Sequence, residues 1–106
     1  MPVVVRENIE VHEFETEIIE QQETDKEKDR IFAVANGEHE IEVTAWGSND
    51  DGVTWEEKET LTIEANNTGA LTVGPHMLSV KLTGKTIEPG NTSTVDACLV
   101  YNSSPG

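Results

Sequence analysis

The chain is short of cysteine, of aromatic residues and of basic residues, and each shortage excludes a class of protein. Its 106 residues include one cysteine, so an internal disulfide framework is excluded. Lysine and arginine number 7 against 21 acidic residues. Nucleic acids and anionic membranes are bound through basic side chains that meet phosphates. We therefore expect neither nucleic acid nor a membrane as a partner.

Long apolar runs are also missing. No stretch approaches the roughly 20 apolar residues that a helix needs to cross a bilayer. Residues 1–6 lack the basic start and the apolar segment of a signal peptide. We therefore expect a chain without a signal peptide that is cytoplasmic until it meets an assembly.

The acidic residues are concentrated in one part of the sequence. Residues 1–64 hold 19 acidic against five basic side chains, and residues 65–106 hold two of each, so the net charge of −14 lies in the first part. One interpretation is a solvated, self-repelling surface that keeps the protein soluble. The other is an acidic face toward solvent, with the neutral C-terminal strands docked on a protein partner or on further copies of the chain.

The residues that are abundant favour strands. Twelve threonines with many valines and isoleucines are typical of β-structure, and an aliphatic core must compensate for the 5% of aromatic residues. Short alternating segments separated by turn residues predict an all-β fold. We expect one domain over residues 1–106, a single antiparallel β-sandwich, Ig-like or jelly-roll-like, with about eight short strands.

The segment Ser48–Trp55 predicts a hairpin corner. Its asparagine, aspartates and glycine tolerate positive φ, and serine and aspartate oxygens accept hydrogen bonds from turn N–H groups. Trp55 can then pack against the hairpin.

Asn36-Gly37 predicts a second hairpin, with a two-residue type I′ turn. It lies between Ile31–Ala35 and Glu38–Trp46. Ala35 would then pair with Glu38. The apolar side chains expected on one face of this hairpin are Phe32, Val34, Ile41, Val43 and Ala45.

The remaining segments are assigned by alternation and by turn residues. Residues 3–20 favour strands with a bulge near His12-Glu13, although a helix would collect Val11, Phe14 and Ile18 on one face. Residues 21–30 are expected to form a charged loop and residues 102–106 a frayed tail. Further strands are expected at 70–73, 77–83 and 92–101. The inward residues expected after the corner are Leu61, Ile63, Ala65, Leu78, Val80 and Leu82.

Few residues suggest chemistry. Cys98 is expected to be a small buried apolar residue rather than a nucleophile. The three histidines have no ligand spacing for zinc, and no cofactor-binding motif is present. Weak calcium candidates supply oxygen atoms near the corner; they are Asn49, Asp50, Asp51 and Glu56. We expect no catalytic residues, no cofactor and no enzyme activity.

The spacing Ser48, Asp50, Gly52, Trp55 resembles the Asp-box, the S-x-D-x-G-x-x-W hairpin of sialidases. It is also similar to hairpins of discoidin-type carbohydrate-binding modules and of small β-sandwich modules in bacteriophage structural proteins. The resemblance implies a structural role, with Ser48 and Asp50 holding the turn and Trp55 packed beneath it. A single copy in a short chain excludes a sialidase propeller.

Two functions follow from these resemblances. Segments Ile41–Trp55 and Leu78–Tyr101 resemble the phage modules, although Ala45-Trp46 replaces the usual aliphatic residue before Gly47-Ser48. That resemblance implies a non-enzymatic virion component, either a capsid-decorating or a tail-associated protein that self-assembles or attaches to a lattice. The alternative is a carbohydrate-binding or adhesion module of the discoidin-like type. Its ligand contacts would be Trp46, His76 and Tyr101.

Overall fold

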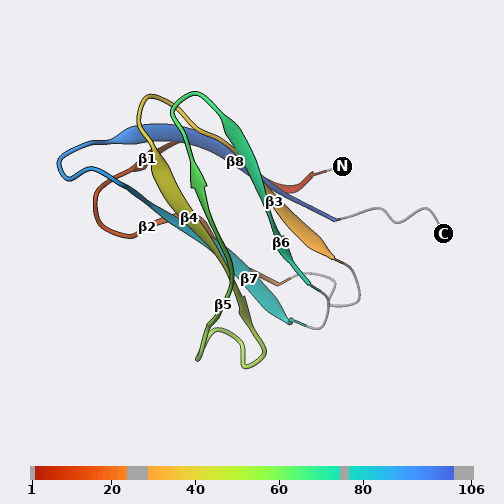
Figure 1. Cartoon of the computed structure of the whole chain (residues 1–106). Helices are drawn as coiled ribbons and strands as arrows, with labels where there is room; N and C mark the ends of the chain where they lie inside the picture. The colour runs from red at the N-terminus through yellow and green to blue at the C-terminus, as the bar shows by residue number, and fades with distance from the viewer. Residues whose placement is uncertain (1, 24–28, 75–76, 102–106) are drawn as a thin grey trace.

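The computed structural model describes residues 2–23, 29–74 and 77–101, which form two four-stranded antiparallel sheets packed face to face (Figure 1). Sheet A has the strand order β1-β8-β3-β6 and sheet B the order β2-β7-β4-β5. The strand bounds are β1 (Pro2–Val11), β2 (Thr16–Glu23), β3 (Arg30–Ala35), β4 (Ile41–Ser48), β5 (Glu56–Ile63), β6 (Thr68–Val73), β7 (Ser79–Thr86) and β8 (Ser93–Tyr101). The predicted all-β sandwich is confirmed.

The strand order is that of an eight-stranded jelly roll rather than an Ig-like sandwich. Among the described strands, β4 and β5 are the one consecutive pair that shares a sheet. Every other step along the sequence carries the chain from one sheet to the other. Strands β1 and β8, at opposite ends of the sequence, lie side by side (Figure 1).

The core is aliphatic and lies between the sheets. Alternation places Ile41, Val43 and Ala45 of β4 inward, where all three are fully buried. Phe32 of β3 is the aromatic side chain of this core. The other large buried apolar residues are Val11, Ile18, Ile19, Val34, Ile63, Leu71, Val73, Met77, Val80, Leu82, Val95 and Leu99.

The predicted hairpin at Asn36-Gly37 is wrong. Strand β3 pairs with β6 and β8, whereas β4 pairs with β5 and β7, so residues 36–40 cross between the sheets. A type I′ turn requires positive φ at both central residues, and neither Asn36 nor Gly37 has it. The predicted apolar face is nevertheless buried, because β3 and β4 contribute to it from opposed sheets instead of side by side.

Residues 3–20, for which strands were favoured over a helix, lie in β1 and β2 and in the turn at 12–15 that joins them. The predicted bulge near His12-Glu13 is wrong, because the chain leaves sheet A after Val11 and enters sheet B at Thr16. One of the two register shifts of β1 lies at Asn8, whose φ is 56° and whose backbone N–H donates to Asp96 Oδ1 over 2.8 Å. A sheet-to-sheet crossing therefore produced the slip in alternation.

The charged loop expected at 21–30 is wrong at both ends. Residues 21–23 belong to β2, and Arg30 begins β3 with its side chain fully buried. Its guanidinium donates to the carbonyl oxygens of Met77, over 2.6 Å, and Gly74, over 2.8 Å. Residues 24–28 and the expected tail at 102–106 lie outside the described residues.

Two residues expected to point inward are exposed. Ala65 lies beyond the end of β5 at Ile63, and Leu78 precedes the start of β7 at Ser79, with 42% of its surface exposed. Alternation holds within a strand and fails past its ends.

Candidate functional site

The corner between β4 and β5 is held by side-chain hydrogen bonds. The Ser48 hydroxyl donates to Asp50 Oδ1 over 2.8 Å and accepts from the Gly52 N–H over 2.9 Å. Asp50 also accepts from the backbone N–H and the hydroxyl of Thr54. Asp51 and Gly52 have φ values of 59° and 86°, as tight turns require. These hydrogen bonds within residues 48–54 hold the turn.

The calcium candidates at this corner have other partners. Asn49 Oδ1 accepts from the Leu78 N–H over 3.1 Å, and Asp51 Oδ1 accepts from Gln21 over 3.4 Å. The hydroxyl and N–H of Thr54 and the hydroxyl of Ser48 lower the pKa of Asp50 to about 2. Within residues 2–23, 29–74 and 77–101, no three His, Cys, Asp or Glu side chains gather as ligands for a metal ion. Glu56 begins β5, with its Oε2 4.0 Å from Lys58 Nζ. The other three candidates hold the corner or join it to neighbouring segments.

The predicted ligand contacts do not form one site. Trp46 lies on β4 of sheet B, and Tyr101 ends β8 of sheet A, where it pairs with Arg30. His76 lies outside the described residues. Trp46 instead shares the outer face of sheet B with Trp55, because Lys81 Nζ lies 5.7 Å from the centroid of the Trp46 ring and 4.5 Å from that of Trp55.

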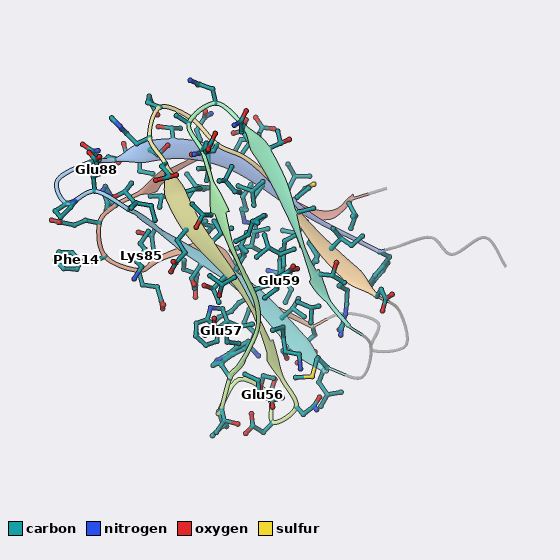
Figure 2. All side chains as sticks on the ribbon, in the orientation of Figure 1. Phe14, Glu56, Glu57, Glu59, Lys85 and Glu88 are labelled. Carbon is teal, nitrogen blue, oxygen red and sulfur yellow. The ribbon has the colours of Figure 1, made fainter. Side chains whose placement is uncertain are left out.

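A hollow on sheet B lies against Trp46. This Trp46 cleft has a volume of about 220 Å³. Its lining comes from β4, β5, β7 and the turn between β1 and β2, and consists of Glu15, Glu42, Thr44, Trp46, Glu57, Thr83, Gly84 and Lys85. Figure 2 labels Glu57 and Lys85, which come from β5 and β7. The cleft combines an aromatic ring with hydroxyl, carboxylate and ammonium groups.

The outer face of sheet A carries a larger and mainly apolar groove of about 680 Å³. This sheet A groove is lined chiefly by small outward side chains of β3, β6 and β8 and by Val5 of β1, which is 48% exposed. Its apolar lining includes Val5, Ala33, Ala35, Ala70 and Cys98, and its acidic lining is Glu7 and Asp96. Cys98, expected to be buried, is partly exposed here.

The sequence of β3 contains an indication of this groove that alternation alone does not reveal. Strand β3 reads Ile31-Phe32-Ala33-Val34-Ala35, so its outward positions are as apolar as its inward ones. Strands with apolar residues on both faces are typically covered on both faces.

The two sheets differ in charge. The strands of sheet A hold three acidic and two basic residues, whereas those of sheet B hold seven acidic and three basic residues. Edge strand β5 alone carries Glu56, Glu57 and Glu59, and acidic edge residues oppose pairing with another chain (Figure 2). The strands of sheet B are therefore the more acidic of the two sets.

Comparisons with known proteins show the fold alone. No protein-family model matches the chain, and no curated protein matches its sequence. A solved structure described as the crystal structure of PirA is similar over 90% of this chain and 91% of its own, with a TM-score of 0.63 and 14% sequence identity. Within the described ranges, no helix is long and apolar enough to cross a membrane. The chain thus shares its sandwich architecture with a solved protein of dissimilar sequence.

Proposed function

We propose that the chain is a non-enzymatic structural module that attaches to a protein assembly through the sheet A groove. The observation that carries the proposal is an apolar, small-residue surface on a chain whose net charge is −14. Contiguous exposed apolar surface of this kind marks interaction sites. The side chains that would orient a small molecule are few there, and two of them, Thr68 and Asp96, lie beside Ala35 at the end of β3, so the groove suits a protein surface.

The charge of the groove indicates what kind of protein surface fits it. The acidic groups in its lining are the carboxylates of Glu7 and Asp96, and among the residues that the structure describes no basic side chain lines it. A second copy of this acidic chain would add negative charge at the interface. A partner with aliphatic side chains bordered by lysine or arginine complements both the apolar lining and the negative charge of the groove.

The assembly we propose is the virion of a bacterial virus, with the chain as a capsid-decorating or tail-associated component. Support comes from the resemblance of Ile41–Trp55 and Leu78–Tyr101 to phage structural modules. By analogy of fold, jelly rolls also build viral capsid domains.

The test compares two variants that each add one carboxylate. Ala33→Glu places it in the sheet A groove, and Thr62→Glu places it at an exposed position of β5 in sheet B. On a density gradient of virus particles, we expect wild type and Thr62→Glu to sediment with the particles and Ala33→Glu to remain free. Circular dichroism checks that both variants fold.

Cys98 provides an independent readout because it is the sole cysteine and lines the groove. Its reaction with a maleimide should slow strongly in the particle-bound protein. Equal reactivity in the bound and free protein, or particle binding by Ala33→Glu at the wild-type level, would contradict the proposal.

A further inference from the structure

We propose that the Trp46 cleft is a carbohydrate-binding subsite that accepts one uncharged pyranose ring. The proposal is independent of docking through the sheet A groove, because the cleft lies on the outer face of the other sheet. It draws on the position of the tryptophans, on the polar groups around Trp46, and on the charge of the cleft.

The tryptophans lie outside the core, although they are the largest apolar side chains of the chain. Trp46 and Trp55 are both partly exposed and flank Lys81 of β7. The Trp46 indole N–H donates to the Thr83 hydroxyl over 2.9 Å, which fixes the ring on the sheet. A ring fixed in advance loses little conformational freedom on binding. Its flat apolar face suits the C–H face of a pyranose.

The polar lining offers what sugar hydroxyls need. Glu57 is the cross-strand neighbour of Trp46, and Glu42 is that of Lys85, whose Nζ lies 4.0 Å from Glu42 Oε1. Carboxylates accept hydrogen bonds from hydroxyl groups, and the ammonium donates to hydroxyl oxygens. Hydrogen bonds to charged groups are stronger than those between neutral groups. The cleft can therefore both accept hydrogen bonds from sugar hydroxyl groups and donate hydrogen bonds to neighbouring ones.

Charge and size narrow the class of ligand. Three carboxylates and one ammonium group line the cleft, so uronic acids, sialic acids and phosphates are repelled. A volume of about 220 Å³ is below the roughly 300–1,000 Å³ of pockets that enclose drug-sized ligands. The cleft fits one sugar ring, with the rest of a glycan in solvent.

A cationic ligand fits less well, although carboxylates beside an aromatic ring often bind ammonium groups. Lys81 already places its own ammonium near the Trp46 ring, and Lys85 places another in the lining of the cleft. These two ammonium groups offset most of the attraction that the three carboxylates of the cleft would exert on a third cation.

The test is a titration of ¹⁵N-labelled protein followed by NMR, which separates the indole N–H signals of its two tryptophans. The probes are methyl glucoside, methyl galactoside, methyl N-acetylglucosaminide, methyl glucuronide and tetramethylammonium chloride. We expect at least one neutral glycoside to shift the Trp46 indole signal together with the amides of Thr44 and Lys85. Methyl glucuronide should bind at least tenfold more weakly.

Variants test whether the glycoside binds in the Trp46 cleft. Trp46→Ala should weaken binding roughly tenfold, because the stacking surface is lost. Trp55→Ala is the matched control, since Trp55 lies on the same face outside the lining of the cleft, and it should bind as wild type. If Trp46→Ala does not fold, Glu57→Gln and Lys85→Ala test the same site at exposed positions, each with a several-fold loss.

Three results would overturn the proposal. The first is no shift from any neutral glycoside up to roughly 100 mM, well above the millimolar Kd expected of a small open site. The second is binding of tetramethylammonium alone or of the glucuronide as tightly as the neutral sugars. The third is a set of shifts confined to the sheet A groove.

Discussion

The two connections on either side of β4 both contain an asparagine or aspartate followed by glycine, and they have opposite roles. Before β4, Asn36 is buried and Gly37 packs against the backbone of another strand. After β4, Asp51 is exposed and Gly52 lies with positive φ in a turn that is covered by the Gln21 side chain. The first connection crosses between the sheets, and the second closes a hairpin within one sheet.

The buried side chain of Asn36 holds the crossing between the sheets through hydrogen bonds. Its Nδ2 lies 2.8–3.1 Å from the carbonyl oxygens of His39, Ile63 and Glu64. Its Oδ1 accepts from the Gly37 N–H and the Ser93 hydroxyl, each over 2.8 Å. One side chain therefore satisfies backbone groups of β5, of the residue after it and of the crossing itself, whereas the bonds made by Ser48 and Asp50 stay within the corner.

The largest expected effect is that of Asn36→Ala. Leaving these buried groups without partners should lower the free energy of unfolding by about 3 kcal/mol. Urea unfolding measures the loss. Asn67→Ala is the matched control at an exposed position and should cost less than about 0.5 kcal/mol. Equal losses for the two variants would mean that the burial of Asn36 adds nothing to its contribution to stability.

The glycines sharpen the comparison. A Cβ on Gly37 would lie 2.4 Å from the backbone oxygen of Thr94, whereas a Cβ on Gly52 would meet the movable end of Gln21. Gly37→Ala should therefore cost about 2–3 kcal/mol through displaced backbone. Gly52→Ala should cost about 1 kcal/mol through its positive φ. Thermal and urea unfolding compare the two, and the reverse order would contradict this account.

A smaller effect is expected at the corner. Ser48→Ala removes the hydroxyl that joins Asp50 to Gly52 and should cost about 1 kcal/mol in urea unfolding. Thr62→Ala, at an exposed position on β5, serves as the control and should leave the midpoint nearly unchanged. A Ser48→Ala loss as large as that of Asn36→Ala would mean that both connections are equally important for stability.

The smallest effect is the pH dependence of the corner. The pKa of Asp50 is lowered to about 2 in the folded chain, from an ordinary value of 3.8. A lowered pKa stabilises the folded state above the ordinary value, and this contribution is lost as pH falls from about 4 toward 2. Asp50→Asn should flatten this part of the stability profile in acid unfolding followed by circular dichroism. If the profile is unchanged, groups other than Asp50 cause the loss of stability in acid.

The candidate surfaces were partly visible in the sequence. Trp46 was predicted as a ligand contact, and the structure places it in a cleft. That cleft is completed by Glu15, Glu57 and Lys85, which lie on other segments of the chain. The sheet A groove went unpredicted because its outward residues come from β1, β3, β6 and β8, and their order in the sheet is not written in any local pattern.

By itself the sequence determined that the chain forms about eight strands, that Phe32, Ile41 and Val43 point inward, and that residues 48–55 turn. Each of these follows from alternation or turn chemistry within a few neighbouring residues. Only the tertiary structure decided that β3 and β4 lie in opposite sheets, that Arg30 is buried, and which residues share an outer face. An inward side chain has the same local pattern whether its partner lies beside it or across the core, so strand order depends on contacts between distant segments.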